Sequence, residues 1–309
     1  MNSKTLLYIV KRLLLAVLTV WVVITVTFFA TRAVPGGPFA SEKAITPAAK
    51  AALEAKYGLD KPVLEQYTTY LQDIVLHFDF GPSLKQRGRQ VIDVITDGLK
   101  TSAKLGVIAA FASLICGVVL GAIAALRRNK VIDRVIMVIT TAFVSMPSFI
   151  MGSLMLVAFS IKLAILPANG STTEGLILPV ITLALYPTAY ITRLTRSSML
   201  DVLGQDYIRT AKAKGVPGKR IIFGHALKNS LIPVITYFGP MLAYIVVGSL
   251  VVEQIFAVPG IGRAFVNSII NRDYPLIMGT TIVLAALIVI MNLVGDILYK
   301  VVDPRINLE

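Results

Sequence analysis

Long apolar runs alternate with polar stretches along this chain, and within each run polar and apolar positions do not alternate. Strands of a membrane barrel would show such alternation, so the pattern disfavours a β-barrel. Each run is long enough, at roughly 17–25 residues, to cross the hydrocarbon core of a bilayer as a helix. The pattern predicts an all-α, polytopic membrane protein with six transmembrane helices, over residues 13–30, 105–126, 135–161, 176–192, 231–252 and 276–298.

Composition agrees with a membrane protein. Hydrophobic residues make up 56% of the 309 residues and charged residues 15%, whereas a typical soluble domain has about 25% charged residues. The first run is longer than the apolar core of a signal peptide, which spans about 7–15 residues. Arg32 also stands where a cleavage site would need small residues. We therefore expect the first run to be an uncleaved span.

The net charge of +13 is concentrated beside the apolar runs. Basic residues that flank membrane spans mark cytoplasmic loops, so their placement indicates contact with membrane lipid and not with nucleic acid. Residues 127–134 hold four basic residues and one acidic residue, and the segment after the fourth run is also basic. Lys4, Lys11 and Arg12 precede the first run. We expect both termini to lie in the cytoplasm.

A polar segment over residues 35–100 separates the first two runs. The sequence Pro-Gly-Gly-Pro at 35–38 predicts a turn that ends the first helix. Thr46 can cap a short helix, Gly58 can end it, and a second helix can begin near Pro62. We expect a small external helical segment. It is either a spacer packed on the membrane part or a surface for docking and guiding substrate.

Helix breakers occur in three successive runs. Proline removes a backbone hydrogen bond, and in lipid the freed carbonyl group needs another partner. Such positions are tolerated where helices pack on one another or line a water-filled path. We expect possible helix breaks that line a path at Pro147, Pro187, Gly239 and Pro240. A simple kink is the alternative at each position.

The residue types that other kinds of site require are scarce. Cys116 is the one cysteine, and His77 and His225 are the two histidines, which excludes disulfides and disfavours a zinc site. An ion-coupled carrier needs ionisable groups near mid-membrane, but the runs hold only Glu253 and Asp296 near their ends. Neither His-Glu-x-x-His nor Gly-x-Ser-x-Gly occurs. A stand-alone carrier and a membrane-embedded enzyme are disfavoured, and we expect no metal or cofactor on this chain.

The segment DYIRTAKAKGVPGKRIIFGHALKNSLIP, residues 206–233, places six basic residues and three glycines between two apolar runs. A basic residue at mid-membrane costs about 2.5–3.5 kcal/mol, so the segment lies outside the hydrocarbon. Helix-forming residues on both sides of Gly215 predict a helix, a turn and a second helix. An anchor on lipid headgroups would explain the charge. A knob that docks into a partner would also explain the hairpin.

The chain lacks a phosphate-binding loop, because residues 215–220 have neither its spacing nor its Ser or Thr.

The sequences RTAKAKG and HALKNSLIP in this segment resemble the cytoplasmic signature loop of ATP-binding-cassette (ABC) importer permeases. The general form of that loop is Glu-Ala-Ala, three residues and Gly. Here Arg209 and Thr210 replace the first two residues, while Ala211 and Gly215 match. These departures, and a longer interval to Pro233, are similar to the peptide/nickel branch of the family. Other stretches across the chain resemble oligopeptide permease subunits: PGGPF, KYGLDKPVLEQYTTYL, DFGPS, SMPSF, residues 253–275 and VVDPRI.

The resemblance implies a type I importer fold and a set of partners. These are a second homologous permease subunit in a heterodimer, two ATPase subunits that bind ATP and Mg²⁺, and an extracytoplasmic peptide-binding protein. It also implies that a short cytoplasmic helix couples the ATPases to the membrane helices. The residues assigned to this ATPase-coupling loop are Arg209, Thr210, Ala211, Lys212, Lys214, Gly215, His225 and Pro233. Packing within the loop remains the alternative role for His225.

The predicted organisation has four parts. They are a cytoplasmic N-terminus with the first span over 1–34, the external segment over 35–100, an ABC transmembrane core over 101–303 with its coupling loop at 197–230, and a cytoplasmic tail over 304–309. The predicted function is a non-catalytic permease subunit for oligopeptide uptake in the bacterial inner membrane. Dipeptides, glutathione and nickel are the alternative substrates for the same architecture.

Overall fold

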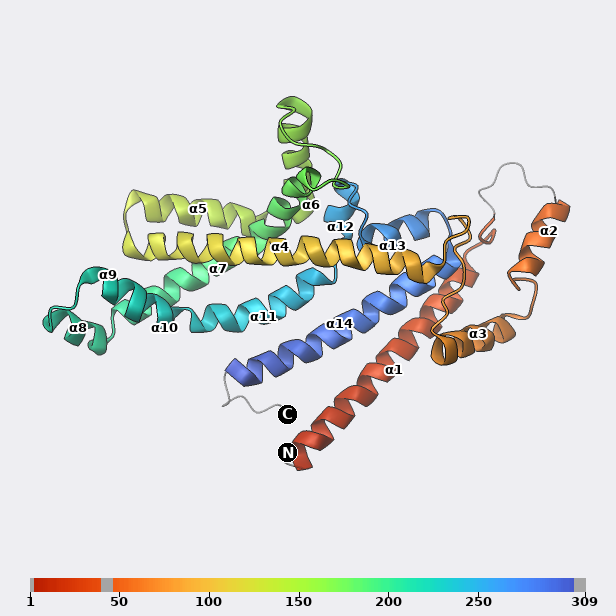
Figure 1. Ribbon diagram of the computed structural model, residues 1–309, viewed down its shortest axis with the longest axis horizontal. Helices are drawn as coiled ribbons and strands as arrows, with labels where there is room; N and C mark the ends of the chain where they lie inside the picture. The colour runs from red at the N-terminus through yellow and green to blue at the C-terminus, as the bar shows by residue number, and fades with distance from the viewer. Residues whose placement is uncertain (1–2, 40–46, 303–309) are drawn as a thin grey trace. The chain divides into compact units, whose positions relative to one another are not determined.

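The computed structural model describes residues 3–39 and 47–302. The chain forms two compact units: unit one comprises Met1–Lys100 and Pro259–Val289, and unit two comprises Thr101–Val258 and Ile290–Glu309. Helices build both units (Figure 1). Within the described ranges, the β-type pairing consists of one isolated bridge between Pro82 and Gln90. The prediction of an all-α protein is confirmed.

Unit one begins with a long helix and continues through two short ones (Figure 1). The second short helix begins directly after Pro62, whose φ of −54° suits a helix start. Gly58, with a φ of +65°, follows the first short helix as predicted. Thr46 lies outside the described residues. The elements are α1 (Ser3–Ala33), α2 (Pro47–Lys56), α3 (Val63–Gln72) with a π-helical turn (Asp73–His77), the start of α4 (Val91–Leu126), α13 (Ile261–Ile270) and the first half of α14 (Tyr274–Val302).

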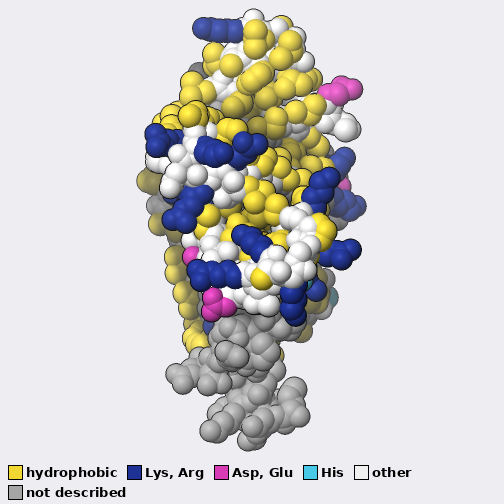
Figure 2. Space-filling model, turned by 90° about the vertical axis from the view of Figure 1, so that its left-hand side faces the viewer, with side chains coloured by type: hydrophobic (Ala, Val, Ile, Leu, Met, Phe, Trp, Pro, Cys, Tyr) yellow, Lys and Arg dark blue, Asp and Glu magenta, His cyan; other side chains and the backbone are white. Residues whose placement is uncertain are grey.

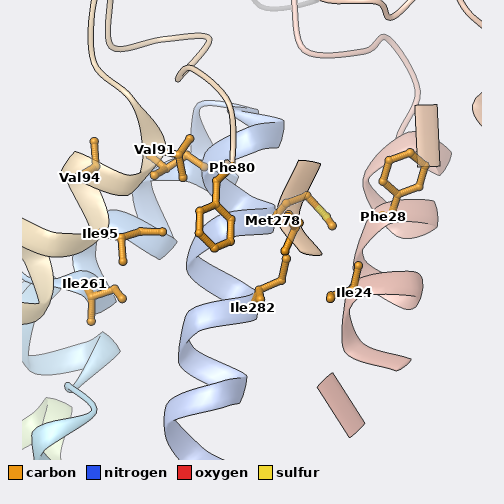
Figure 3. Close-up of a cluster of buried hydrophobic side chains, with 11 residues drawn as sticks. Ile24, Phe28, Phe80, Val91, Val94, Ile95, Ile261, Met278 and Ile282 are labelled. Atoms are coloured by element: carbon orange, nitrogen blue, oxygen red, sulfur yellow. The ribbon is translucent and has the colours of Figure 1, made fainter. Parts of the chain in front are cut away.

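A hydrophobic core holds unit one together (Figure 3). Phe80 comes from the loop before α4 and lies between side chains of α4 and of α14 (Figure 3). Burying side chains of this size stabilises a fold by roughly 1.5–3 kcal/mol each. The buried members of the core are Ile24, Phe28, Ile74, Phe80, Val91, Val94, Ile95, Ile261, Leu276, Met278 and Ile282.

Polar contacts add to this core near the start of α14. Asp273 is buried, and its carboxylate accepts hydrogen bonds from the Ser83 hydroxyl group and, at 3.1 Å, from the Leu84 N–H. The Arg272 guanidinium donates to the Pro35 carbonyl group at 2.9 Å. Residues 80–95 and 35–37 are therefore packed on the helices of unit one, as the spacer alternative requires. The docking alternative stays a prediction.

Unit two contains the rest of α4 and the segments up to residue 258 (Figure 1). Its helices are α5 (Val131–Ser145), α6 (Ser148–Met155), α7 (Ile177–Leu203), α8 (Asp206–Ala213), α9 (Gly218–Arg220), α10 (Lys228–Ser230), α11 (Ile232–Val246) and α12 (Leu250–Ile255). π-Helical turns extend α6 (Leu156–Lys162) and join α9 to α10 (Ile221–Leu227), and a 3₁₀ turn (Glu174–Leu176) leads into α7.

Two glycines let α4 approach α7 closely in unit two. A methyl group added at Gly121 would lie 2.6 Å from the Thr192 carbonyl oxygen, and one added at Gly117 would lie 2.7 Å from Ile191 Cβ. Small residues four positions apart are a common way for membrane helices to reach van der Waals contact. Sequence analysis did not single out this Gly-x-x-x-Gly pair. We call the contact of Gly117 and Gly121 with α7 the α4–α7 seam.

The described residues contain four helices that are long and apolar enough to cross a membrane, or six spans if each of two bent helix pairs counts as one. The four are Lys11–Ala33, Val91–Leu126, Glu174–Leu203 and Tyr274–Val294, and the pairs are Val131–Ser145 with Ser148–Lys162 and Gly218–Ser230 with Ile232–Val246. Many large apolar side chains on these helices are exposed, such as Val17 of α1 at 69%, as lipid or helix contact requires. The prediction of a polytopic membrane protein is confirmed.

Two of the predicted spans are not single straight helices. The third, predicted over 135–161, turns by 108° between α5 and α6. Pro147 causes this break, because proline disfavours helical backbone at the residue before it, and Met146 is extended with φ −89° and ψ 128°. The fifth, predicted over 231–252, ends at Val246 and is followed after Gly248 by the separate helix α12.

The predicted breaks inside the fourth and fifth spans are absent. α7 runs continuously through Pro187, and α11 runs continuously through Gly239 and Pro240. Each proline removes one backbone donor from its helix, and neighbouring turns keep their own bonds. The structure thus shows continuous helix at Pro187, Gly239 and Pro240. Of the four positions, Pro147 alone lies at a helix end.

Candidate functional site

The basic segment after α7 forms the predicted hairpin (Figure 1). α8 ends at Ala213, and the chain reverses at Gly215, whose φ is +73°. The Val216 N–H donates to the Ala211 carbonyl at 3.1 Å, and the Gly215 N–H donates to the Lys212 carbonyl at 3.0 Å. The left-handed backbone at this position favours glycine. Steric crowding is not the reason, because a methyl group added there would meet nothing within 4 Å.

α8 has one buried side and one charged side. Ile208 is fully buried and Ala211 is half-buried, whereas Arg209, Thr210, Lys212 and Lys214 are exposed. Figure 2 looks at this end of unit two and shows many Lys and Arg side chains with few acidic ones. Surface charges of this kind contribute little to stability. The charged side of α8 is exposed, and Arg209 Nη1 lies 3.7 Å from the carboxylate of Asp206 in the same helix.

The second half of the hairpin, from α9 to α10, packs on other helices of unit two. The Asn229 side-chain amide of α10 donates to the Tyr207 hydroxyl of α8 at 2.8 Å. Ala226 is buried against Ala125 of α4 and Met199 of α7. A displacement of the hairpin would therefore act on α4 and α7.

The remaining predicted coupling residues lie further along the chain. His225 lies half-buried in the π-helical turn between α9 and α10. Pro233 is exposed in the first turn of α11, a position that suits proline because it needs no N–H donor there. The structure thus places Arg209, Thr210 and Lys212 together on α8, and leaves His225 and Pro233 on the return toward α11.

A buried ion pair connects α5 to α7. Arg196 Nε and Nη2 donate to the two carboxylate oxygens of Asp133 at 2.6 and 2.7 Å, and the Asn129 N–H donates to Asp133 Oδ2 at 2.9 Å. The Asp133 side chain is 4% exposed and the Arg196 side chain 23%. Two parallel bonds fix both angle and distance between the groups. Sequence analysis missed the pair, although Asp133 is the single acid among the basic residues of 127–134.

Glu253 forms a second buried polar site in unit two. Its side chain is fully buried in α12, and its Oε1 accepts from the Ser102 hydroxyl at 2.8 Å and from the Ser249 N–H at 3.2 Å. Gly248 has a φ of +108°, and a methyl group there would lie 2.9 Å from Glu253 Oε1. The loop after α11 therefore closes around this carboxylate.

The four predicted path residues do not gather at one described site. Pro187 is buried in α7, Gly239 and Pro240 are half-buried in α11, and Pro147 lies at the bend before α6. The rings of Tyr190 and Tyr237, on the same two helices as Pro187 and Pro240, lie 4.3 Å apart. A path along these residues stays a prediction.

Among the described residues, no group of three or more His, Cys, Asp or Glu side chains could hold a metal ion.

Comparisons with known proteins bear on the whole chain. Residues 117–308 match the family described as the binding-protein-dependent transport system inner membrane component, and residues 5–106 match the corresponding N-terminal family. The chain is 45% identical to the dipeptide transport system permease protein DppB of Bacillus subtilis, covering 98% of each protein. It is 44% identical to the oligopeptide transport system permease protein OppB of Salmonella typhimurium, covering 97% of this chain and 99% of the relative.

Solved structures agree on the fold. An inward-facing MetNI methionine ABC transporter is similar at a TM-score of 0.53, with 16% identity, over 68% of this chain and 97% of that one. An amino acid ABC transporter crystallised with histidines gives a TM-score of 0.51, with 17% identity, over 70% of this chain and 95% of that one. These neighbours confirm the expected type I ABC permease fold.

Proposed function

The chain belongs to the family of binding-protein-dependent transport system inner membrane components, and from that premise we propose that it is the permease subunit of an ATP-driven oligopeptide importer. It is a membrane subunit of several spans, and its family consists of inner membrane components. The main support for the proposal is sequence identity: the chain is 43–45% identical to peptide permeases over nearly its full length. A dipeptide importer is the second candidate, because a dipeptide permease is as similar as the oligopeptide ones.

The proposed mechanism centres on α8. Two ATPase subunits in the cytoplasm bind ATP and Mg²⁺, and each grips the coupling helix of one permease subunit. The exposed basic side of α8 supports this role, as do the bond between Tyr207 and Asn229 and the burial of Ala226 against α4 and α7. Movement of α8 is then passed to the membrane helices, and the permease itself catalyses no reaction.

The proposal also covers the other partners and the orientation. A second, homologous permease subunit completes the transport path, and an extracytoplasmic binding protein delivers the peptide. Both termini and the hairpin face the cytoplasm, because the basic residues of 127–134 and of α8 lie beside spans. The segment over 35–100 then faces outward.

The experiment is uptake by the complete transporter reconstituted in proteoliposomes with ATP inside. We expect Gly215→Val to lose most ATP-dependent uptake, because a β-branched residue at φ +73° costs about 1–2 kcal/mol and reorients the hairpin. Membrane insertion and heterodimer assembly should be unchanged. Gly218→Val is the matched control, since Gly218 has open space and no left-handed φ. Full uptake by Gly215→Val would contradict the coupling role.

Uptake of individual substrates separates the two candidate functions. Labelled dipeptides, penta-alanine, glutathione and nickel ions are each offered with the cognate binding protein. Saturable uptake of penta-alanine supports the oligopeptide assignment. Uptake confined to dipeptides would select the dipeptide candidate.

A further inference from the structure

Unit one contains a cavity of about 250 Å³ beside α1, α3 and the start of α14. Aromatic and apolar side chains form part of its wall, and several charged or polar side chains face it. A concave apolar site with a few convergent polar groups is the usual form of a small-molecule site. Its lining includes Phe28, Arg32, Gln66, Tyr70, Asp73 and Tyr274.

Arg32 brings a positive charge to this cavity without a carboxylate partner among the described residues. Its Nε and Nη2 donate to one oxygen of the neutral Gln66 side chain at 3.2 and 3.1 Å, and its Nη1 donates to the Thr31 hydroxyl at 3.4 Å. The ring centroid of Phe28 lies 3.9 Å from the guanidinium carbon. A guanidinium has five N–H donors, so at least two remain for a ligand.

Two tyrosines line the same cavity, and their buried hydroxyl groups have no hydrogen-bond partner in the described part of the chain. Tyr274 is 5% exposed, and neither its hydroxyl group nor that of Tyr70 is bonded. Buried tyrosine hydroxyls normally have a partner. Together with Arg32, they form a set of donors that lacks an acceptor. A carboxylate fits this set, because it accepts several hydrogen bonds and carries the opposite charge.

The wall of the cavity also contains an acidic residue. Asp73 lines it, and within the described residues no cation pairs with the Asp73 carboxylate. Lys61 also lines the cavity, but its ammonium group is bound to Glu65 at 2.8 Å. The cavity therefore offers two unused guanidinium N–H groups for a negative group and an unpaired carboxylate for a positive group.

We propose that this cavity is a binding site for a small zwitterion of the amino-acid or short-peptide class. The ligand carboxylate lies on Arg32, Tyr70 and Tyr274, and its ammonium group lies toward Asp73. Gln66 is a positioning residue: its side-chain amide donates to the Lys61 carbonyl at 2.8 Å, and its carbonyl oxygen holds Arg32. Occupation of the site would fix α1, α3 and α14 to one another in unit one. This site goes beyond the proposed transport function, which does not require it.

The test is isothermal titration calorimetry on the purified full chain in lipid nanodiscs, without ATPase subunits. The probes are L-alanyl-L-alanine, its C-terminal amide and its N-acetyl derivative. We expect saturable binding of the dipeptide and about 10- to 100-fold weaker binding of the amide, because the charge-assisted bonds to Arg32 are lost. The N-acetyl derivative should bind less tightly than the dipeptide as well.

Variants identify the site and separate it from any binding in a transport path. Arg32→Gln should abolish binding, and Arg87→Gln is the control because Arg87 is exposed and does not line the cavity. If Arg32→Gln fails to fold, the double variant Tyr70→Phe with Tyr274→Phe keeps the shape of the wall and should weaken binding at least about tenfold.

Three results would overturn the site: no binding by the native chain, equal binding of dipeptide and amide, or unchanged binding by the tyrosine variant. Failure of ATP-driven uptake would leave these measurements unaffected, so the two proposals fail separately.

Discussion

The α4–α7 seam and the α8 hairpin both depend on glycine, for opposite reasons. At the seam, a side chain on Gly121 would meet the Thr192 carbonyl oxygen at 2.6 Å, so there is no space for one. In the hairpin, Gly215 has open space around it and a φ of +73°. The seam is a packed contact that holds two membrane helices at a fixed separation. The hairpin is an exposed turn whose backbone shape depends on one residue, Gly215. The first region is therefore a close packing contact, and the second is an exposed turn, where we propose that the ATPase binds.

The largest expected effect is at the seam. Gly121→Val should destabilise the protein by about 3 kcal/mol or more, because backbone atoms of α7 cannot yield as a flexible side chain can. Thermal denaturation in detergent, with the yield of monodisperse protein, measures the effect. Gly218→Val serves as the control, since no atom lies within 4 Å of a methyl group there. Equal stability of both variants would remove the distinction between seam and hairpin.

The Asp133–Arg196 pair should rank second. Asp133→Asn leaves the Arg196 guanidinium with a neutral partner, and we expect a loss of about 2 kcal/mol. The figure lies below that for a fully buried pair because Arg196 is 23% exposed. Denaturation of the native and variant proteins at the same ionic strength provides the measurement. Glu65→Gln, in an exposed pair, is the control and should leave the melting temperature unchanged.

A milder change is expected within the hairpin. Tyr207→Phe removes the hydroxyl group that accepts from Asn229, and the loss of stability should be about 0.5 kcal/mol because the bond is exposed. Hydrogen exchange by mass spectrometry should show faster exchange over residues 206–216 and no change over 177–203. Faster exchange in both segments would mean that the hairpin and α7 are one cooperative unit.

Much of this architecture could be predicted from the sequence because lipid imposes simple rules on length and polarity. The apolar runs located the spans, and Gly215 with its flanking helix formers located the hairpin. The 108° turn at Pro147 could not be predicted, because a proline specifies that a helix ends and not where the next one points. Pro187 illustrates the converse, since α7 simply continues through it.

The sites that sequence analysis missed depend on residues far apart in the chain. Asp133 and Arg196 are brought together by the packing of α5 on α7. The cavity beside Arg32 needs Gln66, Asp73 and Tyr274 as well, and no local pattern connects them. In the sequence alone, Arg32 indicates only that a signal-peptide cleavage site is absent after the first run. A charged residue near the end of an apolar run, with no acid close to it in sequence, is the signal that could have identified it.

Crosslinking gives the sharpest test of the proposal that a separate ATPase holds α8. A photoactivatable side chain replaces Lys212 on the exposed side of α8 in the assembled, transport-active complex, and the same probe replaces Lys162, an exposed residue of the π-helical turn after α6. The account predicts an adduct with an ATPase subunit from position 212 and none from position 162. Adducts from position 212 with lipid alone, in a complex that still imports peptide, would contradict it.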